Sequence, residues 1–187
     1  TPELAKQIRA AEDLTDHYED ILGTYLVKLS TRRISAADST EAARLLKIIG
    51  DFERIADHAV NLLQSAEELH EKKMSLSKPA VKELGVLTGA VDEILGLSLD
   101  AFLKDDYSAA GMVEPLEQVI DGLKEQLRTN HILRLQKEQC SIEAGFVWSD
   151  LLTNLERVSD HCSNIAGCVM DLHEGKLNLH ESLRAMK

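Results

Sequence analysis

Asp51-Phe-Glu-Arg-Ile-Ala-Asp-His-Ala-Val-Asn61 is the stretch that decides the fold, because its later part recurs near the other end of the chain. The copy is Glu156-Arg-Val-Ser-Asp-His-Cys-Ser-Asn164, and both versions read Glu-Arg-x-x-Asp-His-x-x-Asn. The five shared residues lie 103 positions apart, and the same shift carries Leu69-His70-Glu71 onto Leu172-His173-Glu174 without a gap. A constant offset of this kind predicts an internal duplication.

Each copy places its Glu, Asp and Asn on one stripe of a helix, because residues four apart are neighbours on a helical surface. These residues are Glu53, Asp57 and Asn61 in the first copy, and Glu156, Asp160 and Asn164 in the second. The apolar residues form a separate stripe nearly opposite. Carboxylates four apart repel each other, so the same conflict in both copies favours a cation between them. A solvated face neutralised by Arg54 and Arg157 is the alternative interpretation.

Apolar residues at helical spacing predict an all-α chain of five long helices and a short final one. The expected ranges are 3–31, 36–73, 79–104, 106–138, 141–174 and, for the short helix, 177–186. Hydrophobic residues make up 44% of the chain but aromatic residues only 4%. A core of aliphatic side chains favours packed helices over a β-sandwich.

The duplication divides the chain into two repeats of unequal content. Residues 1–76 hold two helices, and residues 77–187 hold three long helices plus the short C-terminal tail. The helix missing from the first repeat would precede Thr1. We therefore expect an uncovered apolar face on the first repeat, covered by upstream residues, by the tail or by a second copy of the chain.

A further acidic stripe lies on the helix that precedes each motif helix. Its members are Asp13, Asp16 and Asp20 in the first repeat, and Glu114, Glu117 and Asp121 at an offset of 101 in the second. In an antiparallel hairpin these stripes would approach the motif carboxylates. Oxygen ligands of this kind suit Mn, Fe, Mg or Ca, and also Zn. His58 and His161 are weaker candidates that otherwise lie at the core boundary, and the remaining histidines are expected at the surface.

Composition excludes several classes of function. The net charge is −11, with 32 acidic and 21 basic residues and no basic cluster, which argues against nucleic acid as a partner. No apolar run reaches the ~20 residues that cross a bilayer. The three cysteines, Cys140, Cys162 and Cys168, suit neither a disulfide scaffold nor a thiolate zinc site. We expect reduced core thiols in a cytoplasmic protein.

The two motifs look like the paired signatures of the PhoU family of phosphate-transport regulators. The sequence around these motifs, including His131-Ile-Leu-Arg-Leu135 and Gly145-Phe-Val-Trp-Ser-Asp150, is most similar to the PhoU-like cytoplasmic domain of bacterial sodium/phosphate cotransporters. The resemblance covers most of the chain. It implies two side-by-side bundles of antiparallel helices and a regulatory role rather than an enzymatic one.

The resemblance also implies a multinuclear metal cluster, often of iron or zinc, on the surface of each bundle. Manganese and magnesium are alternatives. The resemblance assigns metal binding first to the motif carboxylates. Asn61 and Asn164 come next, as ligands or as supports of the ligands, and the acidic residues of the preceding helices come last. The full candidate set is Glu53, Asp57, Asn61, Glu156, Asp160, Asn164, Asp16, Asp20, Glu117 and Asp121. The second repeat is expected to hold the better-formed site, because it has all three helices.

The implied partner is the membrane transport domain of a phosphate transporter, with the chain tethered at the cytoplasmic face through residues outside this sequence. A homodimer is a second expectation. Two other classes stay open. One is a docking module that needs no metal, and the other, less favoured, is a ferritin-like metal oxidase. That oxidase needs two Glu-x-x-His motifs, and Glu67-x-x-His70 has Met170-x-x-His173 as its counterpart.

Overall fold

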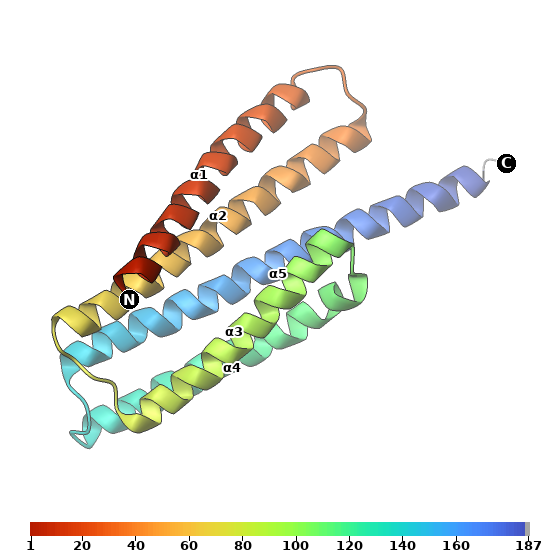
Figure 1. Cartoon of the computed structure of the whole chain (residues 1–187). Coiled ribbons are helices and arrows are strands. Elements are labelled where there is room, and N and C mark those ends of the chain that lie inside the picture. Colours follow the sequence, from red (N-terminus) through yellow and green to blue (C-terminus); the bar gives the residue numbers. More distant parts are fainter. Residues whose placement is uncertain (186–187) are drawn as a thin grey trace.

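The chain is built from five long helices, described from a computed structural model (Figure 1). They are α1 (Pro2–Ser30), α2 (Ala36–Glu71), α3 (Lys78–Lys104), α4 (Tyr107–Gln136) and α5 (Ile142–Ala185). The structure describes the backbone of residues 1–185 and the side chains of residues 1–175. No strand occurs in that part of the backbone, which confirms the all-α prediction.

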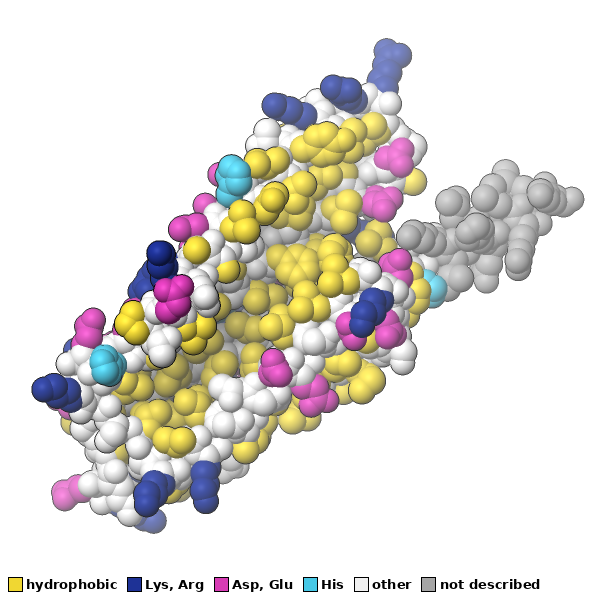
Figure 2. All heavy atoms as spheres, viewed as in Figure 1, with side chains coloured by type: hydrophobic (Ala, Val, Ile, Leu, Met, Phe, Trp, Pro, Cys, Tyr) yellow, Lys and Arg dark blue, Asp and Glu magenta, His cyan; other side chains and the backbone are white. Residues whose placement is uncertain are grey.

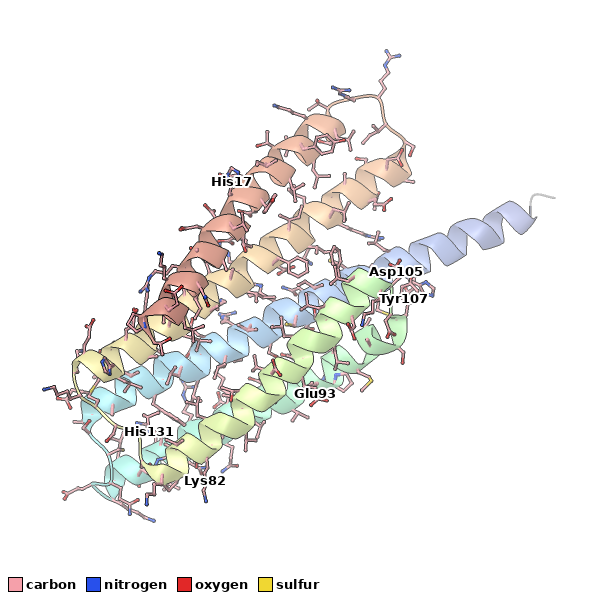
Figure 3. All side chains as sticks on the ribbon, viewed as in Figure 1. His17, Lys82, Glu93, Asp105, Tyr107 and His131 are labelled. Carbon is pink, nitrogen blue, oxygen red and sulfur yellow. The ribbon has the colours of Figure 1, made fainter. Side chains whose placement is uncertain are left out.

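Side-chain caps begin α2 and α4 close to the predicted starts of these helices. Ser35 accepts a hydrogen bond from the Asp38 amide at 3.1 Å, and Asp106 accepts one from the Ala109 amide at 3.0 Å. Each bond satisfies an amide that has no partner within its own helix. At the C-terminal end of α3, Asp105 adopts a left-handed φ of 52° and turns the chain towards α4 (Figure 3).

One boundary prediction was wrong. The sequence suggested a break near Gly175 and a separate short helix over 177–186, but α5 continues through this point to Ala185. Glycine at a helix end is common, yet a single glycine inside a helix costs only about 1 kcal/mol, and here it does not stop the helix. Met186 lies outside the described residues.

The helices form a three-helix bundle and a two-helix hairpin (Figure 1). Helices α3, α4 and α5 pack against one another, whereas α1 packs against α2 alone among the described residues. The α2–α5 contact joins the hairpin to the bundle. The second repeat is thus a three-helix bundle and the first a two-helix hairpin, as the unequal helix count predicts.

The hydrophobic core lies mainly in the three-helix bundle. Leu87, Ile94, Val113, Ile120 and Trp148 are among its most deeply buried residues. A smaller cluster of Ile48, Ile165 and Cys168 lies where α2 meets α5. Cys162 and Cys168 are buried as expected of core thiols, while Cys140 is half-buried, and burial raises the pKa of Cys162 to about 12.

The hairpin of the first repeat leaves an apolar face uncovered. Large side chains of α1 are exposed there: Leu4, Leu14, Tyr18, Ile21, Leu22 and Tyr25. Figure 2 shows hydrophobic side chains gathered along α1 and in the hollow between the α1–α2 hairpin and α3.

No helix among the described residues combines the length and hydropathy needed to cross a membrane.

The α2–α5 cluster makes a direct prediction about stability. Ile165→Ala should lower the free energy of unfolding by about 2–5 kcal/mol, because Ile165 is fully buried and the change leaves a cavity. Ile142→Ala, at an exposed position of the same helix, should change it by less than about 0.5 kcal/mol. Urea unfolding followed by circular dichroism measures both. Equal effects would show that α5 is not packed against α2.

Candidate metal centre

The two motif helices lie against each other and exchange hydrogen bonds through their histidines. His161 Nδ1 on α5 lies 2.9 Å from Asp51 Oδ1 on α2. Reciprocally, His58 Nδ1 on α2 lies 2.8 Å from Asn154 Oδ1 on α5. Asn154 is 103 residues from Asp51, as His161 is from His58, so the two bonds are equivalent under the duplication. The histidine rings stack with centroids 5.6 Å apart.

The hydrogen-bond partners of these histidines indicate which ring nitrogen donates. Asn154 uses its amide nitrogen to donate to the Asp150 carbonyl at 2.8 Å, so its oxygen accepts from His58 Nδ1. An ionised Asp51 only accepts, so His161 donates from Nδ1 as well. Both histidines therefore use Nδ1 at the contact between the repeats.

Asn164 also turns towards this contact. Its amide nitrogen donates to Asp51 Oδ1 at 3.0 Å, so that oxygen accepts from both Asn164 and His161. Asp51 is only 6% exposed, and its other oxygen has no partner among the described residues. The predicted carboxylate stripe thus does not include Asn164, and its equivalent Asn61 is exposed. Asp51 is a site residue that the sequence did not single out.

The first acidic face forms between α1 and α2, as the hairpin predicts, but Glu12 and Glu19 of α1 join the predicted Asp16 on it. Glu12 approaches Asp57, which raises the pKa of Glu12, and Glu53 approaches Glu19, which raises the pKa of Glu53. Desolvation first, and then the charges of Asp13, Asp57 and Asp16, raise the pKa of Glu12. Burial, Asp57 and Glu19 raise the pKa of Glu53, and Arg54 opposes them.

The second acidic face forms between α4 and α5 from the predicted residues. Burial raises the pKa of Glu117, and the charges of Glu114, Asp160, Asp121 and Glu156 add to it in that order. Because crowded carboxylates disfavour the charged form, both faces would gain from a nearby cation. The charges of three predicted carboxylates of this repeat, Asp160, Asp121 and Glu156, thus act on the fourth, Glu117.

Three basic or hydroxyl side chains already contact carboxylates of the second face. Lys124 Nζ lies 3.1 Å from Glu156 Oε2, and the Ser163 hydroxyl donates to Glu114 Oε2 at 2.7 Å. Arg157 also lies 3.2 Å from Asp160, but its side chain is exposed. The face is therefore partly neutralised by its own protein side chains.

Under the duplication each residue of α1 corresponds to a residue of α4. The predicted correspondence was wrong by one helical turn. Glu12 stands to Asp57 as Glu117 stands to Asp160, which is an offset of 105 and not 101. Under this offset Asp16 corresponds to Asp121, and no longer to Glu117 as predicted. Asp20, in contrast, is exposed and contributes no charge effect to Glu53 or Glu12. Glu12 and Glu19 lie seven residues apart, on the row of α1 that also holds Ile8 and Leu26. This spacing was the sequence signal that could have identified Glu12 and Glu19 as the residues facing α2.

The geometry defines what these faces can do. Carboxylate oxygens from two helices are the donor set that hard divalent and trivalent cations prefer. In the described part of the chain, no three His, Cys, Asp or Glu side chains are gathered closely enough to hold a metal ion in their present rotamers. The first face fits a cation by the chemistry of its donors, while the second has a lysine among them.

His131 differs from the expected surface position. It lies near the end of α4 (Figure 3), half-buried beside Trp148, with its Nε2 buried and unpartnered in the described residues. Burial lowers the pKa of His131. A Cβ at residue 145 would lie 2.6 Å from this nitrogen, so Gly145 lets the α4–α5 ends approach. The Gly145-Phe-Val-Trp sequence thus has a packing role.

The contact around Asp51 can be tested by mutation. Asp51→Ala should lower the free energy of unfolding by about 1–3 kcal/mol, because it leaves the His161 and Asn164 donors without an acceptor. Asp171→Ala, at an exposed position on α5, is the matched control and should stay within about 0.5 kcal/mol of wild type. Chemical denaturation measures both. Indistinguishable variants would mean that the polar contact does not stabilise the α2–α5 interface.

Comparison with known proteins agrees with this architecture. The PhoU domain model matches residues 1–66 and 86–169. A phosphate-specific transport system accessory protein PhoU homolog 1 from Thermotoga maritima is 29% identical over 143 residues, 76% of this chain and 60% of that protein. The Pseudomonas aeruginosa PhoU homolog is 27% identical over 98% of this chain and 76% of its own length. The chain thus spans less than two thirds of the Thermotoga relative.

A solved structure shows the same fold. The crystal structure of PhoU from Pseudomonas aeruginosa superposes with a TM-score of 0.84 at 25% sequence identity, covering 92% of this chain and 82% of that one. The family model matches well over half of the chain and includes both motifs. The chain therefore belongs to the PhoU family.

Proposed function

We propose that this chain is a regulatory accessory domain of phosphate transport without catalytic activity of its own. The observation that carries the proposal is the match of the PhoU domain model to both repeats. Its relatives are named accessory proteins of phosphate-specific transport systems, which describes a role beside a transporter. The chain would act by binding and changing contacts, as a regulator does.

The membrane partner we propose is the transport domain of a phosphate transporter. The uncovered apolar face of α1 supports a docking role, since a monomeric protein rarely exposes an apolar surface of this kind. The sequence resemblance favours a sodium/phosphate cotransporter, with the chain at the cytoplasmic face. The names of the relatives favour a phosphate-specific transport system instead. A homodimer formed through the same face is the competing occupant.

Docking through α1 should depend on its apolar side chains. Tyr18→Glu with Tyr25→Glu should abolish co-purification of the full protein with its phosphate transporter from membranes, because two charges would be buried in the contact. Leu103→Glu, at a still more exposed position on α3, should leave co-purification intact. Retained binding in the Tyr variant would contradict docking at α1.

Phosphate uptake in the same cells distinguishes the two transporter classes. An effect of the Tyr18→Glu, Tyr25→Glu variant on sodium-dependent uptake would identify a cotransporter. An effect confined to sodium-independent uptake would identify a phosphate-specific transport system. If the variant converts a dimer to a monomer and uptake is unchanged, the face joins two copies of the chain.

We further propose that the chain binds metal ions through its acidic carboxylates, with iron or zinc expected first and manganese or magnesium as alternatives. The carboxylates that would hold the ion on the first face are Glu12, Asp16, Glu19, Glu53 and Asp57. The corresponding carboxylates of the second face, Glu117, Asp121, Glu156 and Asp160, already have Lys124 against Glu156. A bound ion would supply positive charge that ties neighbouring helices together. The crowding that raises the pKa of Glu53 and Glu117 supports this proposal.

Elemental analysis of natively purified protein tests metal binding. Replacing the four motif carboxylates, by Glu53→Gln, Asp57→Asn, Glu156→Gln and Asp160→Asn, should abolish bound metal while circular dichroism remains helical. Asp92→Asn with Glu93→Gln removes two exposed acids of α3 (Figure 3 labels Glu93) and should keep wild-type metal content. Wild-type protein free of metal after supply of Fe, Zn and Mn would leave a docking module that needs no metal.

A further inference from the structure

The two acidic faces differ at one structurally equivalent position. Glu12 meets Asp57 on the first face, and Glu117 meets Asp160 on the second. Seven residues further along the same helices lie Glu19 and Lys124. Because seven residues are two helical turns, both side chains return to the same side of their helix and reach the motif glutamate. The duplication therefore pairs an acid in one repeat with a base in the other.

Lys124 is held in this position more firmly than an ordinary surface lysine. Its ammonium lies 3.1 Å from Glu156 Oε2, and the two side chains are only 17% and 15% exposed. Lys124 also lines a cavity of about 190 Å³ with Trp148 and Leu152, so its aliphatic stem lies beside apolar side chains. The exposed Lys72–Glu68 and Lys104–Asp100 pairs have neither feature.

Among the residues whose side chains the structure describes, no cation occupies the corresponding place on the first face. Glu53, the equivalent of Glu156, has Glu19 as its neighbour on α1. Its nearest base is Arg54, which follows it on the same helix, lies 3.6 Å away and is 64% exposed. Arg157 occupies the same place in the second repeat, so this arginine does not distinguish the faces. Only Lys124 does.

A partly buried lysine competes with a metal ion for the same oxygen. The ammonium and a metal ion both need the charge of Glu156, and two cations cannot share it at close range without repulsion. Binding of a metal at the second face must therefore first separate the Lys124–Glu156 pair. Nothing equivalent has to be separated at Glu53.

We propose that Lys124 is a tethered cation that takes the place of a metal ion at the second acidic face, so that the first face is the one that takes up metal. The inference rests on the proposed metal-binding function and reverses the sequence-based expectation that the second repeat holds the better site. It gives the two repeats different tasks. The first senses a cation, and the second keeps its structure without one.

Counting bound Mn²⁺ in each variant tests the inference. The full chain is stripped with a chelator and titrated with Mn²⁺, and free Mn²⁺ is measured from its electron paramagnetic resonance signal. Glu53→Gln with Asp57→Asn should remove wild-type binding, and Glu156→Gln with Asp160→Asn should leave it. Lys124→Gln should add binding at the second face that is about tenfold or more tighter than in wild type. That gain should vanish when Glu156 and Asp160 are also replaced.

Two matched variants separate charge from side-chain shape and general electrostatics. Lys124→Arg keeps the positive charge and should bind as wild type does. Lys104→Gln removes an exposed ion-paired lysine at the end of α3 and should create no new site. Circular dichroism of each variant checks that the fold is retained.

The outcomes distinguish the inference from the function on which it rests. Equal loss of Mn²⁺ in the two carboxylate variants would overturn the role of Lys124 and leave metal binding standing. Lys124→Gln without added binding would overturn it too. No Mn²⁺ bound by wild type or by Lys124→Gln would overturn both proposals. Gain of a second site in Lys124→Gln alone would support the inference.

Discussion

The contact between α2 and α5 is the constraint on which the rest of the structure depends. It joins the two repeats through reciprocal bonds, His161 to Asp51 and His58 to Asn154. With the motif histidines turned inward at this contact, the motif Asp, one residue earlier, points about 100° away round its helix, and the Glu four residues before the Asp lies on the same stripe as the Asp. There α1 and α4 supply further carboxylates. One polar interface therefore fixes both acidic faces and keeps them on separate sides of the molecule.

The sequence predicted the helices and the duplication because both leave periodic signals in the chain. It also predicted the carboxylate pairs of the second repeat, because α4 and α5 are neighbours in a hairpin. It did not predict the α1 register, where Glu12 and Glu19 replace Asp13 and Asp20. Periodicity gives the angle between stripes on one helix, but packing against the next helix decides which stripe faces inward. The role of Asp51 was missed for the same reason, since its partners are more than 100 residues away.

The two repeats share a pattern of residues but have diverged in what covers them. The second repeat has a complete bundle, a buried core and a lysine beside its motif glutamate. The first has an uncovered apolar face and carboxylates without an inward-facing base. The first repeat therefore has an apolar surface that could still be buried and carboxylates whose charge a cation could still neutralise. A regulatory domain needs such features, because partners and ions act only on surfaces that can still gain from binding them.

The most direct test of this account is a crystal structure of the natively loaded protein with anomalous diffraction measured at the absorption edge of its metal. The account predicts an anomalous peak between α1 and α2 beside Glu53 and Asp57, with His58 and His161 still bonded across the α2–α5 contact. A peak between the two histidines, or one of equal height beside Glu156 and Asp160, would contradict it.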